Sequence, residues 1–177
     1  PNIRAISLSG NNFGDYGAFS MADLILQSHH IIALDLTSNS LSDKGGTAIF
    51  QALSRNKSLI SLKIGSSSGV SRNSFGSETM RNLEFMLKKN KVLEELDMSM
   101  TEINADNIVC LANGLHENKT LQVLQLANNN IQTRGTAAIL SAAVSSNLRE
   151  LCLASNHLKD DVSSVFAEFL SRSQTIQ

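Results

Sequence analysis

The stretch Leu121-Gln-Val-Leu124-Gln-Leu126-Ala-Asn-Asn129-Asn-Ile131 recurs, with substitutions, along the whole chain. Its apolar residues occupy the first, fourth and sixth positions, and the last two alternate with polar neighbours, as in a strand that is buried on one face. Asparagine follows the strand, and its amide can bond backbone groups on both sides of a turn. The stretch therefore predicts a short strand that ends in an asparagine-stabilised turn.

Six copies of this pattern can be aligned, and a seventh begins near the end of the chain. Their first apolar residues are Ile3, Ile31, Leu59, Leu93, Leu121, Leu148 and Ile176, which are 28, 28, 34, 28, 27 and 28 residues apart. The long spacing indicates a six-residue insertion in the third unit, between its strand and Phe75. The short spacing indicates a one-residue deletion before the sixth strand. We expect a single repeat domain over residues 1–177, and because both ends stop within the pattern, a segment of a longer protein.

The second half of each unit has apolar residues four positions apart, which places them on one face of a helix. These residues form two rows, Met21, Ile49, Leu83, Leu111, Ile139 and Phe166, and then Ile25, Leu53, Leu87, Leu115, Ala143 and Leu170. We expect both rows to be buried, because a unit can cover its apolar face only by stacking on its neighbours. Residues suited to capping the helix N-termini are Asp15, Asp43, Ser77, Thr133 and Asp160. Glycines that would allow close packing follow at Gly17, Gly45 and Gly135.

The asparagine of the turn is present as Asn11, Asn39, Asn129 and Asn156. Stacked units would align these side chains into a ladder of hydrogen bonds. The fourth unit has Thr101, and we expect a weaker rung there because a hydroxyl makes fewer bonds than an amide. The third unit offers Ser67 or Asn73, depending on where the insertion lies. The sequons Asn56-Lys-Ser58 and Asn118-Lys-Thr120 occupy equivalent positions before a strand, and we interpret them as part of the repeat turn.

The repeat length of 28 residues, together with the segment Leu41–Leu59 that reads L-S-D-K-G-G-T-A-I-F-Q-A-L-S-R-N-K-S-L, resembles leucine-rich repeats of the ribonuclease-inhibitor-like subfamily. The resemblance covers essentially the whole chain. It implies an α/β fold, a right-handed solenoid or horseshoe with a parallel sheet on the concave face and helices on the convex face. Members include ribonuclease inhibitor, the GTPase-activating protein of Ran, immune sensors and actin regulators, so the fold alone does not give the function.

The balance of charges excludes several classes of partner. The chain has 15 basic and 16 acidic side chains, a formal net charge of -1, which gives no overall attraction to nucleic acid or to an anionic membrane. No apolar run is long enough to span a bilayer, and the start at Pro1 lacks the features of a signal peptide. The two cysteines, Cys110 and Cys152, fall at different phases of the repeat, which favours reduced thiols and a cytoplasmic location.

Strand side chains that alternate with the buried ones point to a sheet face that no helix covers. We call this surface the open face and predict that it binds a partner through Asp35, Lys63, Glu95, Asp97, Gln125, Glu150 and Cys152. The alternative is that Asp35, Lys63 and Asp97, which lie on neighbouring strands and alternate in sign, only pair with one another at the surface.

The insertion, residues 65–74, is rich in glycine and serine and contains Arg72. It is predicted to form a mobile loop and a second candidate contact for a partner. The alternative explanation is tolerance, because extra loop residues cost little closure entropy. Arg72 also suggests GTPase activation as an alternative function, because arginines of GTPase activators stabilise charge in phosphoryl transfer. The motif of the Ran activator, however, is not matched here residue by residue.

No nucleotide-binding glycine loop, nucleophile elbow, paired carboxylates or metal-ligand spacing occurs in the sequence. No metal, cofactor or small-molecule substrate is therefore expected, and the chain is predicted not to be an enzyme. The predicted function is a protein-protein interaction module that binds a protein partner through the open face and the 65–74 loop. The alternatives are a GTPase activator resembling the Ran activator, and a structural repeat segment of an immune-type sensor or an actin regulator.

Overall fold

The fold alternates one short strand with one helix, six times. The computed structural model describes residues 3–67, 69 and 71–172. The strands are β1 (Ala5–Ser7), β2 (Ala33–Asp35), β3 (Ser61–Lys63), β4 (Glu95–Asp97), β5 (Val123–Gln125) and β6 (Glu150–Cys152). The helices are α1 (Gly14–Gln27), α2 (Asp43–Leu53), α3 (Ser77–Lys89), α4 (Ile108–Glu117), α5 (Gln132–Ser145) and α6 (Val162–Arg172). The seventh unit expected at Ile176 lies outside the described residues.

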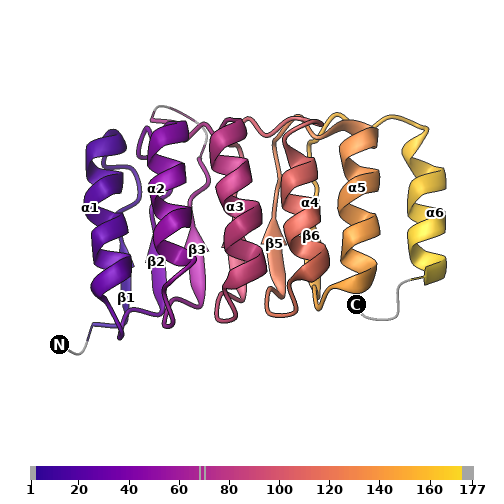
Figure 1. The fold of residues 1–177 in the computed structure, drawn as a ribbon. Coiled ribbons are helices and arrows are strands. Elements are labelled where there is room, and N and C mark those ends of the chain that lie inside the picture. The colour runs from indigo at the N-terminus through magenta and orange to yellow at the C-terminus, as the bar shows by residue number, and fades with distance from the viewer. Residues whose placement is uncertain (1–2, 68, 70, 173–177) are drawn as a thin grey trace.

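The six strands form one parallel sheet in the order β1-β2-β3-β4-β5-β6, so each strand pairs with its neighbour in sequence. Equivalent positions of the repeat face each other across the sheet, as in the pairs Leu34 with Leu62 and Leu96 with Leu124. All six helices form a single layer on one side of this sheet (Figure 1). Within the described residues no helix or strand covers the other side. The α/β solenoid predicted from the repeat is confirmed.

The core lies between the sheet and the helix layer. The apolar strand residues Leu34, Leu62, Leu96 and Leu124 are at most 2% exposed, and the helix residues Ile49, Leu83, Leu111 and Ile139 are 0% exposed. Equivalent residues of the first and last units, such as Leu8, Met21 and Leu153, are only partly buried. The end units have a neighbour on one side only, so the core is deepest in the middle of the stack.

The last helix departs from the predicted apolar row. Leu170, which was expected to be buried, is 70% exposed, and Phe169 is buried in its place at 7% exposure. Phe169 and Val165 line a hollow between α6 and α5 together with Leu140 and Val144. Helix α6 packs on α5 alone among the described elements, so the face turned toward α5 is the one that is buried.

The prediction that Asp15 caps its own helix was wrong, because its carboxylate caps the next one. Asp15 lies inside α1 and accepts hydrogen bonds from the amides of Ser42 (2.8 Å) and Gly45 (3.1 Å) at the start of α2, and from the Ser42 hydroxyl at 2.5 Å. The close approach requires Gly45, since a Cβ there would lie 2.5 Å from Asp15 Oδ1. Ser42 is the N-cap of α2, and its hydroxyl accepts from the amide of Lys44.

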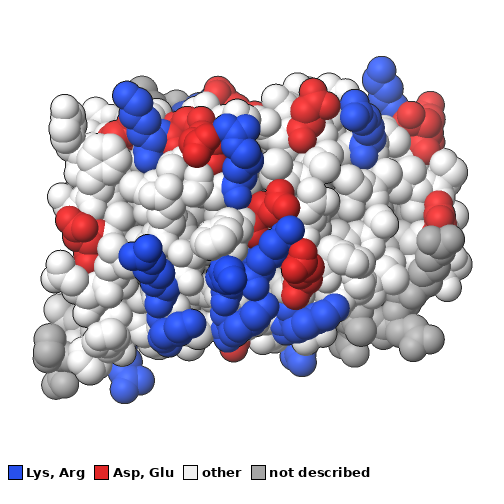
Figure 2. All heavy atoms as spheres, in the orientation of Figure 1, with Lys and Arg blue, Asp and Glu red and all other residues white. Residues whose placement is uncertain are grey.

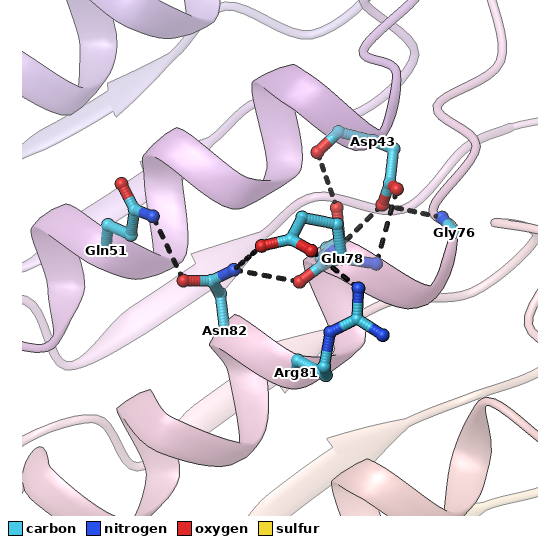
Figure 3. A network of polar contacts seen from close by, with 7 residues as sticks. Asp43, Gln51, Gly76, Glu78, Arg81 and Asn82 are labelled. Carbon is cyan, nitrogen blue, oxygen red and sulfur yellow. Dashed lines mark hydrogen bonds and ion pairs between the residues drawn. The ribbon is translucent and has the colours of Figure 1, made fainter.

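Asp43 repeats this arrangement one unit later (Figure 3). Its carboxylate accepts from the amides of Gly76 (2.9 Å), Glu78 (3.3 Å) and Thr79 (2.8 Å) at the start of α3. Burial raises the pKa of Asp43, but the hydrogen bonds from Thr79, Glu78 and Gly76 outweigh it and hold the pKa below its ordinary value. Each aspartate therefore satisfies amides that have no partner within their own helix, and it ties neighbouring units together.

Candidate functional site

The open face has two rows of side chains that run across the strands. The row at the strand ends contains Asp35, Lys63, Asp97, Gln125 and Cys152, each opposite the next in the sheet register. The row two residues earlier contains Glu95, Val123 and Glu150. The sheet therefore brings the predicted strand residues together on one surface. Four carboxylates and one ammonium group give this set a net charge of -3.

Asp35 is held in place by hydrogen bonds from both sides. Its carboxylate accepts from the Ser7 hydroxyl at 3.1 Å and from the amide of Thr37 at 3.0 Å. Burial raises the pKa of Asp35, but the bonds from Thr37 and Ser7 and the nearby charge of Lys63 bring the pKa below its ordinary value. Asp35 is therefore an oriented, negatively charged group on the open face.

Lys63 is exposed and makes no direct ion pair with its neighbours. Across the described part of the chain, the ion pairs within 4.0 Å are Arg81–Glu78, Lys88–Glu84, Lys88–Glu117 and Arg134–Asp106. Lys63 therefore forms no ion pair within 4.0 Å with Asp35 or Asp97, although its charge helps to lower the pKa of Asp35. The Asp97 carboxylate instead accepts from the amide of Ser99 at 2.9 Å.

Gln125 and Glu150 are joined by a hydrogen bond at the β5–β6 end of the open face. Gln125 Nε2 donates to Glu150 Oε1 at 2.6 Å, which orients both side chains across β5 and β6. Glu95 is exposed, and Cys152 is half-buried with a free thiol. The open face is thus polar, and none of the large apolar side chains that are exposed in the described residues lies in its two rows.

The insertion leaves the turn geometry intact because Asn73, not Ser67, takes the ladder position. Asn73 Oδ1 accepts from the amides of Asn39 (3.0 Å) and Leu41 (2.9 Å), and its Nδ2 donates to the carbonyls of Leu36, Ile64 and Gly65. The insertion is tied to the preceding unit on both sides, since the Ser67 amide donates to the Ser38 hydroxyl at 2.8 Å and the Ser71 carbonyl accepts from the Ser40 amide at 2.9 Å. Arg72, just before Asn73, is exposed, and no hydrogen bond or ion pair joins its side chain to another described residue.

The other predicted ladder residues make the same kind of bonds. Asn39 Oδ1 accepts from the amide of Asn11, and Asn129 Oδ1 accepts from the amides of Thr101 and Ile103. Asn156 Oδ1 accepts from the amide of Ile131 at 3.3 Å. Thr101 makes fewer bonds: its hydroxyl donates to Met98 of its own unit at 2.7 Å, and no side-chain bond to the preceding unit is present in the described region.

A second asparagine ladder lies at the opposite edge, where helices lead into strands. Its members are Asn56, Asn90 and Asn118, all at most 5% exposed. Asn118, for example, donates to the carbonyl of Leu87 at 2.7 Å and accepts from the amides of Thr120 and Leu121. The matching positions of Asn56 and Asn118 predict a role in the repeat turn, but they do not by themselves reveal Asn90 or the bonds between units. The signal that identifies the ladder is an asparagine three residues before the first apolar residue of the next strand.

The one-residue deletion falls in the corresponding turn after α5. Ser146 stands where the turns after α2, α3 and α4 have asparagine and the turn after α1 has Ser28, and its hydroxyl accepts from the amide of Leu148 at 3.2 Å. The next residue, Asn147, reaches back to the carbonyl of Lys119 at 2.7 Å. The shortened turn therefore keeps its tie to the preceding unit.

The described residues contain no other obvious chemical centre. No group of three or more His, Cys, Asp or Glu side chains in them could hold a metal ion. Cys110 is a free thiol whose pKa is raised by burial and by the charge of Glu84, which disfavours its reactive thiolate form. The helices of the described ranges include none with the length and apolar character that a membrane span requires.

Comparisons with known proteins agree with this architecture. A family model for leucine-rich repeats matches residues 1–22, 27–50 and 117–140. A search of curated proteins gives no match.

Two solved structures share the fold. One is described as leiomodin-1 actin-binding site 2, with a TM-score of 0.64, 15% sequence identity, and coverage of 97% of this chain and 81% of that chain. The other is the tropomodulin C-terminal domain of Caenorhabditis elegans, with a TM-score of 0.65, 13% identity, and coverage of 81% of this chain and 84% of that chain. Together with the six parallel strand-helix units and the matched repeats, these similarities identify the fold as a leucine-rich-repeat solenoid.

Proposed function

We propose that the chain is a non-enzymatic protein-binding module of the ribonuclease-inhibitor-like subfamily that holds a protein partner on its open face. The observation that carries this proposal is the uncovered side of the sheet, where the register of six strands fixes polar side chains in two rows. Binding residues on a rigid scaffold lose little conformational entropy when a partner docks. The open face therefore offers a preorganised surface.

The charge of the open face suggests the chemistry of the partner. Asp35, Glu95, Asp97 and Glu150 give it a negative character that is interrupted by Lys63. A partner that presents Lys or Arg side chains, with one acidic group opposite Lys63, would match this pattern. Such complementarity contributes mainly to specificity and to the rate of association. The proposed partner is a cytoplasmic protein, because both cysteines of this chain would stay reduced in the cytoplasm.

The 65–74 loop is proposed as a second contact for the same partner. Arg72 is exposed without a described side-chain partner, so its guanidinium can be used without breaking an existing interaction. The loop follows β3, whose Lys63 is part of the open face. A partner seated there would approach the base of this loop.

Site-specific photocross-linking tests which surface is used. A photoreactive amino acid at Gln125, on the open face, should cross-link a protein partner in cells, whereas the same group at Asn113, exposed on α4, should not yield that product. Purified actin is the first defined probe, because one solenoid of this fold is described as an actin-binding site. Equal cross-linking from both positions, or from Asn113 alone, would contradict the proposal.

A further inference from the structure

The outer side of the helix layer has an apolar groove that is separate from the open face. It has a volume of about 730 Å³ and lies over α2, between α1 and α3. Its rims carry Phe19 (42% exposed), Leu26 (43%) and Phe85 (53%), three of the large apolar side chains that are exposed in the described residues. Tyr16, 87% exposed, packs edge-on against Phe19 and extends the α1 rim.

The groove arises from a difference in side-chain size between neighbouring helices. The outward positions of α2 are occupied by small residues, Ala48 and Ala52, which form the floor. The flanking helices carry the larger side chains Phe19 and Phe85 along the groove, so its two rims stand higher than the floor on α2. Gln51 on the floor donates to Asn82 of α3 at 3.1 Å and braces one wall (Figure 3).

The dimensions of the groove fit a helix. The lining residues of α1 are Phe19, Ala22, Asp23 and Leu26. Those of α2 and the turn after it include Ala48, Gln51, Ala52 and Arg55, and both sets have spacings of i, i+3, i+4 and i+7. Seven residues of helix span roughly 10 Å. The groove is thus about two helical turns long and runs along α2, which suits the apolar stripe of an amphipathic helix laid between two ridges.

Positive charge gathers at one end of the groove. Arg55 and Lys89 line this end, and Lys89 Nζ lies 5.9 Å from the centre of the Phe85 ring. Figure 2 shows Lys and Arg side chains concentrated along the same lower edge of the helix layer, where the helices end. Lys57 and Lys91 lie in the adjoining turns. None of these four cations takes part in a described ion pair, whereas Lys88 is paired with Glu84 and Glu117.

Cations near helix C-termini also complement the helix dipoles, which accounts for part of this distribution. Dipole compensation does not explain why exposed phenylalanine and leucine side chains border the same cations. Apolar rims next to charges without ion-pair partners are instead what a docked amphipathic segment with acidic residues would complement.

We infer that this groove binds an amphipathic helix of a partner protein. The apolar face of that helix packs on Phe19, Leu26 and Phe85, and its acidic residues lie toward Arg55 and Lys89. The site is independent of the open face, so one chain can hold two different protein surfaces at once.

Two synthetic peptides test the inference. Both have 18 residues, with leucine at helical spacing on one face; glutamate fills the polar face of the first and lysine that of the second. Fluorescence anisotropy should show at least tenfold tighter binding of the glutamate peptide. Amide signals that shift in the isotope-labelled protein should belong to α1, α2 and α3. Shifts confined to the strands, or equal affinity for both peptides, would overturn the inference.

Variants of the groove sharpen this test. Ala48→Arg fills the floor and should weaken binding of the glutamate peptide at least tenfold, while Asn113→Arg on α4 adds the same charge outside the groove and should not. The double variant R55E/K89E should reverse the preference toward the lysine peptide. Gln125→Arg, on the open face, should change neither affinity. Unchanged binding by Ala48→Arg, with its thermal unfolding still cooperative, would exclude the groove as the site.

A second copy of the chain is the competing occupant. Sedimentation analysis of the protein without peptide should show a monomer. A dimer that Ala48→Arg dissociates would show that the groove is a self-association surface and would overturn the assignment to a partner helix.

Discussion

The amide of Asn73 donates to the hydroxyl oxygen of Ser66 at 2.8 Å, across the base of the insertion. In the neighbouring unit the amide at this ladder position, that of Asn39, donates to the side chain of the next ladder asparagine. The unit after Asn73 has Thr101, whose hydroxyl is used within its own turn. Ser66 therefore supplies the acceptor that Thr101 lacks, so the insertion and the missing asparagine are structurally linked.

Ser66→Ala should lower the free energy of unfolding by about 1–2 kcal/mol, because it leaves the partly buried amide of Asn73 without its acceptor. Urea denaturation measures this change, and Ser77→Ala, an exposed serine on α3, serves as the control. Adding Thr101→Asn to Ser66→Ala should recover most of the loss by restoring the asparagine acceptor. If the double variant is no more stable than Ser66→Ala alone, the proposed link between these positions is wrong.

Asn73→Ala should destabilise the protein by about 3 kcal/mol or more, since five side-chain hydrogen bonds to buried backbone groups are lost. Asn11→Ala should cost less, because Asn11 is exposed in the first unit and its side chain bonds only carbonyls of its own turn. The comparison requires urea unfolding curves of both variants. Equal losses would show that the stability contributed by a ladder asparagine does not depend on its position in the stack.

The sequence predicts most of the fold because the 28-residue period and the burial of alternate strand residues reflect the same stacking. Leu34, Leu62 and Leu96 lie where the pattern expects them. The capping role of Asp15 could not be read in this way, since its partners Ser42 and Gly45 belong to the next unit. A pattern within one unit does not reveal contacts made between units.

Of the two binding surfaces, the open face can be predicted from the sequence and the groove cannot. The strand register that assembles the open face follows from the repeat, whereas the groove over α2 depends on the sizes of outward residues such as Ala48 and Phe85. Outward positions are not constrained by the core, so no period marks them. The ladder position of Asn73 can be predicted from the sequence, because every ladder residue lies two positions before the apolar residue that closes its turn. In the third unit that apolar residue is Phe75.

The stability that Asp43 contributes should depend on pH. Its folded-state pKa is depressed, so the contribution is present above the unfolded value near pH 4 and is lost as the pH falls through the lower folded pKa. The stability difference between the natural chain and Asp43→Asn should therefore shrink from pH 6 to pH 3. Urea unfolding at both pH values measures it, with Ser77→Ala as a pH-independent control. A constant or growing difference would contradict the capping role.

Leu126→Ala should destabilise the protein by about 2–5 kcal/mol, because Leu126 is 0% exposed in the middle of the stack and its removal leaves a cavity. Leu8→Ala, at a partly buried position of the first unit, should cost less. Thermal and urea unfolding report both values. A loss below 1 kcal/mol for Leu126→Ala would show that the stack relaxes around the cavity.

Partner binding by the open face is tested most directly by the affinity of the cross-linked partner for two arginine variants. Gln125→Arg breaks the bond to Glu150 and puts positive charge on the open face, whereas Asn113→Arg adds the same charge to α4. Isothermal titration calorimetry should show at least tenfold weaker binding by Gln125→Arg, unchanged binding by Asn113→Arg, and nearly unchanged melting temperatures for both. Unchanged affinity of Gln125→Arg would contradict the assignment of the open face as the binding surface.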